Sequence, residues 1–311
     1  MKKWILKAIV QKIISFLPFS NVINFQFQKY VTKGVYLSDE YFYDRLSHAQ
    51  AHLAAYATYA TPAHGIPRVC LELGTGWYPV VPISFFLVGV EKTYSVDIAM
   101  LTSKERVRTT LAKFVEAHER GLLATYLTPD PQKWATLLDL VANIDRLSLE
   151  ELLAALHLEY KIEDARQLSL PDNAIDLVNS NNTFEHIYPD ILTPILKDFA
   201  RVVNKEGGIM SHFIDMSDHF AHFDRSINIY NFLQFSAPQW AWIDNTIQPQ
   251  SRLRVDDYRD IYSKLGIPIT AEDNREGDVA ALRTIALHPD YAAKPLAVVA
   301  VSHCHFISQM K

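Results

Sequence analysis

From Pro67 onward the chain alternates short, continuous apolar runs with segments of helical periodicity, and this alternation constrains the fold more than any other feature. Apolar runs of this kind are typical of strands buried on both faces, with the intervening helices covering a mostly parallel sheet. The pattern therefore predicts an α/β fold with helices on both faces of the sheet. The expected strands are 68–73, 92–96, 158–162, 174–179 and 208–214, followed by two late strands at 268–271 and 296–308.

The segments outside this alternation indicate further helical parts of the chain. Residues 19–60 carry many aromatic side chains and end in an alanine-rich stretch before Pro62, which is typical of a helical cap. We therefore expect an N-terminal helical cap or lid at 1–62 and one α/β domain at 63–311. Residues 101–157, between the second and third strands, are longer than one covering helix requires, so we predict a helical insertion that roofs a pocket.

The first residues, MKKWILKAIVQKIISFLPF, have the periodicity of an amphipathic helix that ends at Pro18. Lysines interrupt the apolar run, no small-residue cleavage site follows, and about 20 apolar residues would be needed to span a bilayer. Neither export nor a membrane span is therefore predicted. Two interpretations stay open: a helix docked on the protein's own body, and peripheral contact with a membrane. The predicted apolar side consists of Ile5, Ile9, Ile13 and Phe16 or Leu17, and the polar side of Lys3, Lys7, Gln11 and Ser15.

The composition indicates a folded protein and argues against nucleic-acid partners. Of the 311 residues 49% are hydrophobic, and the 30 basic and 35 acidic side chains give a formal net charge of -5. A chain of this charge gains no overall attraction to phosphate backbones. Cys70 and Cys304 both lie in apolar runs, which suits two buried thiols in a reducing compartment better than a disulfide. We expect a cytoplasmic protein, and the sequence leaves its oligomeric state undetermined.

Two of the ten glycines stand two positions apart directly after the first predicted strand, in Glu72-Leu73-Gly74-Thr75-Gly76. This loop falls at the carboxyl edge of the sheet, where open α/β folds bind ligands, and glycine lets a ligand approach the backbone. Asp97 ends the second predicted strand at the spacing of an acid that accepts hydrogen bonds from ribose hydroxyls. Together these residues predict a ligand that contains a nucleoside.

Further along, an ordered series of motifs narrows the choice of nucleoside. It consists of Asp164-Ala165, Leu170-Pro171-Asp172-Asn173, IDLVNSNNTFEHI at 175–187 and FARVVNKEGGIM at 199–210. The series resembles the class I S-adenosylmethionine-dependent methyltransferases, particularly the branch of ubiquinone and menaquinone biosynthesis enzymes. The resemblance implies a Rossmann-like sheet and S-adenosylmethionine as the cofactor. Tyr78 departs from it by replacing the third glycine of the family's loop. A dinucleotide dehydrogenase is the competing interpretation, but the third glycine of its motif is also absent.

The resemblance also implies a set of cofactor-binding residues at the ends of the predicted strands. Asp97 would hold the ribose hydroxyls and Ile98 would pack on the adenine, whose amino edge would meet Asp164 and Ala165. Asn181 would lie beside the reactive sulfonium. Aromatic side chains of the cap could stabilise the sulfonium charge by cation–π contact. The whole predicted set is Glu72, Gly74, Thr75 and Gly76 around the methionine half, then Asp97, Ile98, Asp164, Ala165 and Asn181, with Tyr36 from the cap.

A sulfonium methyl group is already activated, so the protein mainly has to align the acceptor and take a proton if the acceptor loses one. We expect that base after the fourth or fifth predicted strand, and the catalytic candidates are His186, His219 and Asp215. The segment after the fifth strand repeats imidazole and carboxylate groups, which also invites a metal site. Because that segment has no helical pair of histidines four residues apart, we predict no metal. Its other polar members are His212, Asp218, His222 and Asp224.

The acceptor is expected to be a small molecule. Asn181-Asn182-Thr183-Phe184 differs from the Asn-Pro-Pro-Tyr-like tetrapeptide of DNA adenine methyltransferases, and neither cysteine is placed to attack a cytosine. We predict methyl transfer to a metabolite, a natural-product intermediate or a glycan or lipid precursor. Two alternatives stay open: a cyclase or lyase that releases methylthioadenosine, and a non-catalytic nucleoside-binding or membrane-associated scaffold. Candidates for the acceptor pocket are Tyr230, Phe232, Trp240, Trp242, Arg252 and Arg254.

Overall fold

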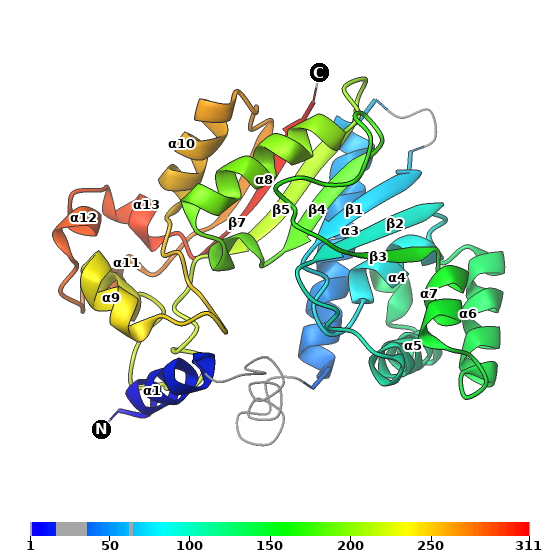
Figure 1. Ribbon diagram of the computed structural model, residues 1–311, viewed down its shortest axis with the longest axis horizontal. Coiled ribbons are helices and arrows are strands. Elements are labelled where there is room, and N and C mark those ends of the chain that lie inside the picture. The colour runs from blue at the N-terminus through cyan, green and yellow to red at the C-terminus, as the bar shows by residue number, and fades with distance from the viewer. Residues whose placement is uncertain (1, 17–35, 62–64, 311) are drawn as a thin grey trace.

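A single seven-stranded sheet forms the centre of the protein (Figure 1). The computed structural model describes residues 2–16, 36–61 and 65–310. The strand order is β3-β2-β1-β4-β5-β7-β6, in which β1 to β5 are parallel and β7 is antiparallel to both of its neighbours. The carboxyl ends of β1 to β5 therefore share one edge of the sheet. The strands are β1 (Val69–Leu73), β2 (Lys92–Asp97), β3 (Leu158–Ile162), β4 (Leu177–Asn181), β5 (Ile209–Asp215), β6 (Ala271–Arg275) and β7 (His303–Gln309).

The predicted α/β class and its mostly parallel sheet are confirmed, and the first three strands lie within a residue of their predicted bounds. The prediction was wrong for 296–308, where residues Leu296–Ala300 form the helix α13 and the strand begins only at His303. A short buried apolar run fits a helix and a strand equally well, so its periodicity could not separate the two. Strands β4 and β6 also begin later than 174–179 and 268–271 predicted.

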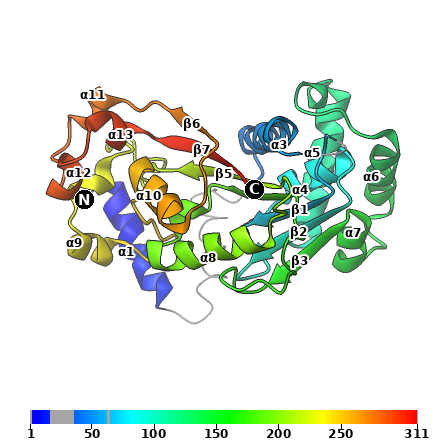
Figure 2. The same ribbon diagram turned by 90° about the horizontal axis from the view of Figure 1, so that it is seen from above.

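Helices cover both faces of the sheet, as Figure 2 shows from above. On one face, α8 and α10 pack against β1 and β4 through a core that includes Leu71, Phe199 and Tyr258. On the other face, α3 and α4 cover Cys70 and Leu177. The helices are α1 (Lys3–Ser15), α3 (Asp39–Tyr59), α4 (Val80–Leu87), α5 (Lys104–Glu119), α6 (Pro131–Asn143), α7 (Leu149–Ala155), α8 (Pro189–Val202), α9 (Ala237–Ile243), α10 (Val255–Leu265), α11 (Val279–Leu282), α12 (Pro289–Ala292) and α13 (Leu296–Ala300).

The long helix α3 lies directly on the sheet. Ser38 caps its N-terminus by accepting a hydrogen bond from the backbone amide of Tyr41. Its buried side includes Phe42 and Leu46 together with His52, which is fully buried. α3 contacts α4, β4 and β5. It therefore brings its side chains to strands that lie far away in the sequence, and the site described below depends on this placement.

The predicted insertion at 101–157 is helical and contains α5, α6 and α7. These helices pack with α4 into one apolar cluster, which includes Phe86, Leu111 and Leu152, at the end of the sheet that carries β3 (Figure 1). The pocket described below takes no residue from this insertion, whereas we expected the insertion to roof a pocket. The predicted boundary after Pro62 lies outside the described residues, and a cap or lid at 1–62 stays a prediction.

Helix α1 forms as its periodicity predicts, but it docks with a different side from the one expected. Its buried residues are Trp4, Ala8, Gln11 and Ile14. The backbone amide of Trp4 donates a 3.0 Å hydrogen bond to the carboxylate of Asp224. Ile9, Ile13 and Phe16, which belong to the predicted apolar side, are exposed. The predicted stop at Pro18 lies outside the described residues.

Candidate active site

The loop after β1 holds two glycines in a backbone conformation that other residues rarely adopt. Gly74 has φ +73° and Gly76 has φ +71°. A Cβ on Gly74 would lie 2.7 Å from the hydroxyl oxygen of Thr183, so the close approach of the loop after β4 also requires glycine there. A Cβ on Gly76 would meet no atom within 4 Å. The loop therefore leaves open space beside Gly76, at the carboxyl edge of the sheet.

The carboxylate of Glu72 lies buried beneath this loop. The hydroxyl of Thr75 donates to its Oε2 at 2.6 Å, and the side-chain amide of Asn181 donates to its Oε1 at 2.8 Å. Burial raises the pKa of Glu72 to about 7. The two hydrogen bonds lower this pKa, but their effect is smaller than that of burial. A desolvated carboxylate of this kind is stabilised by a cationic partner.

Two histidines of α3, which the sequence analysis missed, hold Asn181. His52 Nε2 lies 3.1 Å and His48 Nδ1 lies 3.0 Å from the amide oxygen of Asn181. Since the amide oxygen accepts, His52 donates from Nε2, and its Nδ1 accepts from the hydroxyl of Ser211 at 2.7 Å. Burial lowers the pKa of His52 well below its usual value and that of His48 to about 3. The available signal was their spacing, four residues apart on one helix.

A second group of predicted residues lies along β2 and β3. The carboxylate of Asp97 accepts from the backbone amides of Ile98 and Ala99, and burial raises the pKa of Asp97. Ile98 is 86% exposed, so an apolar side chain stands open beside this carboxylate. Asp164 is bound by the guanidinium of Arg166, at 2.9 Å, and this hydrogen bond lowers the pKa of Asp164 to about 2.

The other predicted cofactor residues, Ala165 and Tyr36, differ in exposure. Ala165 is buried, and Tyr36 is 53% exposed just before α3. The carboxylate of Asp164 is partly exposed. Hydrogen bonds thus join Glu72, Thr75 and Asn181 into one network, which contains neither Asp97 nor Asp164.

A pocket with about 200 Å³ of empty space lies next to the ends of β4 and β5. This volume includes open solvent, so the enclosed part of the pocket is far smaller than the roughly 300–1,000 Å³ of typical ligand pockets. Both apolar and polar side chains line it. Its lining residues are Glu185, Asp215, Met216, Ser217, His219, Phe232, Gln250, Ser251, Arg252 and Leu253.

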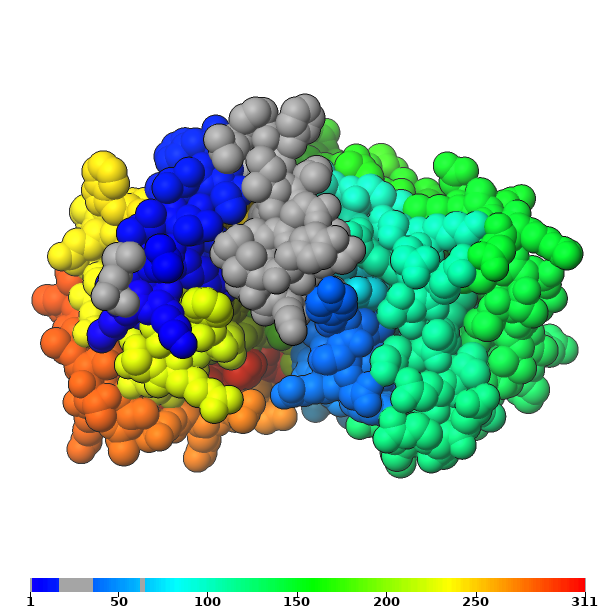
Figure 3. Space-filling model, turned by 90° about the horizontal axis from the view of Figure 1, so that it is seen from below, coloured from blue at the N-terminus to red at the C-terminus, as the bar shows by residue number. Residues whose placement is uncertain are grey.

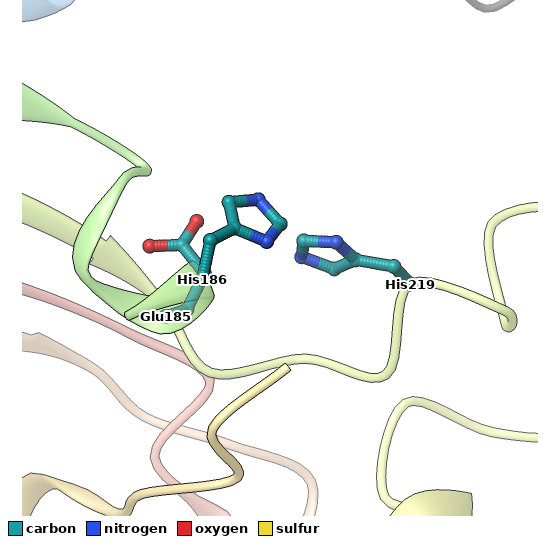
Figure 4. Close-up of side chains that lie close together, drawn as sticks. All are labelled: Glu185, His186 and His219. Carbon is teal, nitrogen blue, oxygen red and sulfur yellow. The ribbon is translucent and has the colours of Figure 1, made fainter. Parts of the chain in front are cut away.

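Glu185 and His219, which line this pocket, lie close to His186 (Figure 4). One ligand atom of each lies within 4.8 Å of the others, a separation at which the three could hold a metal ion. Glu185 is buried, and its carboxylate oxygens have no hydrogen-bond partner among the described residues. Burial, reinforced by the charge of Asp215, raises the pKa of Glu185 well above its usual value. The sequence predicted no metal site, whereas the structure brings together three side chains that could ligate a metal ion.

The tautomer of His186 follows from one hydrogen bond. Its Nδ1 lies 2.6 Å from the backbone oxygen of Pro249. A carbonyl oxygen can only accept, so Nδ1 carries the proton and Nε2 keeps the lone pair. Burial, reinforced by neighbouring His219, lowers the pKa of His186 to about 4. The imidazole is therefore neutral near pH 7.

Asp215 and His219, the other two catalytic candidates, face each other. Asp215 Oδ2 lies 3.5 Å from His219 Nε2, and Oδ1 lies 3.3 Å from His303 Nε2. Although burial alone raises it, the pKa of Asp215 lies below its usual range because of the hydrogen bond and charge of His219. The side-chain nitrogen of Gln248 is 3.2 Å from His219 Nδ1. Both ring nitrogens of His219 thus face polar groups of the protein itself.

Several other predicted residues lie away from the pocket. His212 is buried beneath Phe184, and Trp242 is 83% exposed. Arg254 is fully buried and donates to the backbone oxygens of Met216, Val299 and Val301. Phe232 and Arg252 do line the pocket. The guanidinium of Arg252 donates to the backbone oxygens of Phe232 and Phe235.

A family model described as a methyltransferase domain matches residues 120–211, less than a third of the chain. No curated protein matches the sequence. Similar solved structures include the PH0226 protein of Pyrococcus horikoshii, with 13% identity, a TM-score of 0.46, and 92% of this chain and 99% of that chain covered.

Two further similar structures carry methyltransferase descriptions. One is 1,6-didemethyltoxoflavin-N1-methyltransferase of Burkholderia thailandensis with S-adenosylhomocysteine bound, at 12% identity, a TM-score of 0.45, and coverage of 94% of this chain and 89% of that chain. The other is a SAM-dependent methyltransferase of Methanosarcina mazei, at 14% identity, a TM-score of 0.42, and coverage of 78% and 92%.

The matched segment contains β3, β4 and the first residues of β5, and with them Asp164, Asn181, Glu185 and His186. The methyltransferase-domain model thus matches the segment that carries these residues, within a Rossmann-like α/β fold. The match agrees with the expected family and with S-adenosylmethionine as the cofactor, and the ubiquinone and menaquinone branch stays a prediction.

The residues present fit this cofactor. The open space beside Gly76 lets a ligand reach the backbone, and the buried carboxylate of Glu72 suits a cationic amino group. The exposed side chain of Ile98 offers an apolar surface for a flat base beside Asp97. These features lie at the shared carboxyl edge of β1 and β2, where the sequence analysis expected them.

Proposed function

We propose that the protein transfers a methyl group from S-adenosylmethionine to a small-molecule acceptor bound in the pocket between Glu185 and Arg252. The observation that carries the proposal is the position of this pocket, which follows the ends of β4 and β5 and takes its polar lining from Glu185, Asp215 and His219. Its limited volume favours a small acceptor group over a folded macromolecule. The net charge of -5 agrees with an acceptor other than a nucleic acid.

On the cofactor side, we propose that Glu72 binds the cationic amino end and that Asn181 orients it. Asn181 is held by Glu72 on one side and by His52 on the other, so its amide is fixed before any ligand arrives. Preorganisation of this kind reduces the entropy lost when the reacting atoms are aligned. Asp97 is the proposed partner of the ribose hydroxyls, and Gly74, Thr75 and Gly76 of the methionine half.

For proton transfer we propose His186 as the general base. S-adenosylmethionine supplies an activated methyl group, to which the acceptor atom forms a bond while the carbon–sulfur bond breaks and its electron pair stays on sulfur. The proton of the acceptor atom passes to His186 Nε2, the ring nitrogen that keeps its lone pair because Nδ1 donates to Pro249. Asp215 and His219 are then positioning residues, since His219 packs edge-on against His186 with ring centroids 4.9 Å apart.

The test follows cofactor-derived products by mass spectrometry, with and without pools of hydroxylated and aminated small acceptors. We expect S-adenosylhomocysteine that depends on an acceptor. Methylthioadenosine formed from S-adenosylmethionine alone would instead favour a cyclase or lyase, and an inert complex would favour a binding protein.

A pair of variants tests the proposed base. His186→Gln is expected to lower kcat by about 10²–10⁴-fold with little change in KM for the acceptor. His222→Gln is the matched control, because the His222 side chain is 60% exposed at the edge of the same cluster. An equal loss of kcat in both variants would contradict the assignment of His186.

A further inference from the structure

The outer side of α1 presents apolar side chains to solvent. Leu6 is 52% exposed, Ile9 44%, Ile13 58% and Phe16 78%. These residues recur three or four positions apart, so they form one stripe along the helix. We call this stripe the apolar face of α1. Single exposed apolar residues are ordinary, whereas a contiguous stripe marks an interaction surface.

The orientation of α1 is fixed from its other side. Trp4, Ala8, Gln11 and Ile14 are buried against the body of the protein. The ammonium group of Lys12 donates a 3.0 Å hydrogen bond to the backbone oxygen of Ala241 and another to that of Asp244. Rotating the helix to bury the apolar face would break these contacts and expose Trp4. The exposure is therefore built into the docked position of the helix.

An exposed tryptophan lies on α9, the helix that α1 contacts. Trp242 lies in α9, between the two residues whose backbone oxygens bind Lys12, and is 83% exposed. Helices α1 and α9 are in contact, and Figure 3 shows α1 and the yellow part of the chain side by side on one face of the molecule. Phe223, 40% exposed, lies under the ammonium group of Lys7. Tryptophan at the rim of such a face is typical of membrane interfaces.

The charge of this segment is opposite to that of the chain. Residues 2–16 contain Lys2, Lys3, Lys7 and Lys12 and no acidic residue, although the whole chain has a net charge of -5. Lys2 and Lys3 are exposed at the start of the helix. An apolar stripe with exposed lysines at its N-terminal end matches the surface of an anionic bilayer, which attracts the cations and takes up the apolar side chains.

We propose that the apolar face of α1, with Trp242, docks on the surface of an anionic phospholipid bilayer. The helix lies in the plane of the interface, because its 13 residues span about 20 Å against a hydrocarbon core of about 30 Å. Within the described parts of the chain, none of the helices is long and apolar enough to cross a bilayer.

This surface is also linked to the proposed active site. The side-chain amide of Gln11, on the inner side of α1, donates to Gln248 at 3.3 Å, and Gln248 in turn contacts His219. Docking would therefore bring the acceptor pocket close to the lipid surface. The docking itself is independent of methyl transfer and can be measured without a substrate.

The experiment is sedimentation of the full chain with vesicles of phosphatidylcholine mixed with phosphatidylglycerol, and with vesicles of phosphatidylcholine alone. We expect binding to the mixed vesicles, at least tenfold weaker binding to the neutral ones, and release in about 1 M salt, where the Debye length is about 3 Å. The double variant Leu6→Glu with Ile13→Glu is expected to bind at least tenfold more weakly. Leu138→Glu is the matched control, since Leu138 is 43% exposed on α6 at the far end of the molecule.

Each other outcome overturns the proposal. The proposal is wrong if the wild-type protein stays in the supernatant when mixed vesicles are sedimented. Equal loss of binding in the Leu138→Glu control would show that the apolar face of α1 has no special role. Light scattering that finds a dimer, dissolved by the double variant and indifferent to vesicles, would assign the face to a second copy of the chain. Circular dichroism and the melting temperature of each variant check that the fold is retained.

Discussion

Replacing Glu72 by Gln should change how the stability of the protein depends on pH. Burial raises the pKa of Glu72 from 4.5 to about 7. A carboxyl whose pKa is raised on folding stabilises the protein fully below its unfolded value and loses that contribution as pH rises through the folded value. Between about pH 5.5 and 8.5 this loss amounts to about 2 kcal/mol, since one pKa unit corresponds to about 1.4 kcal/mol.

The glutamine variant lacks this titration and keeps the shape of the side chain. Its amide oxygen can still accept from Asn181, as Oε1 of the carboxylate does at 2.8 Å. We therefore expect the stability of Glu72→Gln relative to wild type to rise with pH. The difference between the two free energies of unfolding should be about 2 kcal/mol larger, in favour of the variant, near pH 8.5 than near pH 5.5. For a chain of this length the difference corresponds to about 3 °C in melting temperature.

Urea unfolding of both proteins at the two pH values measures this difference. Glu150→Gln is the control, because Glu150 is exposed on α7. Its substitution should change the free energy of unfolding by the same amount at both pH values, within about 0.5 kcal/mol. The same carboxyl is about half protonated near pH 7, so binding of S-adenosylhomocysteine should release about half a proton from wild type and none from Glu72→Gln. Titration calorimetry in two buffers of different ionisation enthalpy measures the release. A pH dependence of stability that is identical in Glu72→Gln and wild type would refute the reasoning.

Three further substitutions probe the same edge of the sheet and its support. Gly76→Ala should lower the free energy of unfolding by about 1 kcal/mol because of the positive φ at this position. Gly74→Ala should lower it by at least twice as much, because the added Cβ would also crowd Thr183. Equal losses in urea unfolding would contradict the steric argument. Asn181→Ala removes a donor from a buried carboxylate and should weaken S-adenosylhomocysteine binding about tenfold by calorimetry, so unchanged affinity would speak against its orienting role. Arg254→Lys cannot reach all three backbone oxygens that the guanidinium binds and should lower stability by about 3 kcal/mol, and an unchanged melting temperature would be inconsistent with that account.

Local sequence signals were sufficient for the parts of the fold that depend on neighbouring residues. The glycines at 74 and 76 and the acid at 97 follow buried apolar runs, which are typical of strands in a covered parallel sheet. The signal was weaker where one apolar run suits two structures. Leu296–Ala300 became a helix, and Ile175 forms an isolated bridge with Val203 before β4 begins. Which alternative a short run adopts depends on the surface that it packs against.

The docking side of α1 shows the same limit. Its periodicity predicts an amphipathic helix, and the helix forms, but Trp4 and Gln11 are buried while Ile13 stays exposed. Gln11 can be buried because Gln248, 237 residues away, accepts its hydrogen bond. A sequence pattern ranks side chains by their own polarity and cannot include a partner that only folding provides.

By itself, the sequence determined that this chain forms a parallel α/β sheet with a glycine loop and an acid at one edge, because buried strands and tight turns are encoded by adjacent residues. Only the tertiary structure decided which polar groups meet there. His48 and His52 reach Asn181 across about 130 positions of the chain, and Pro249 assigns the tautomer of His186. The proton affinities of Glu72 and His186 depend on burial and on hydrogen bonds, and both arise from contacts between segments far apart in the sequence.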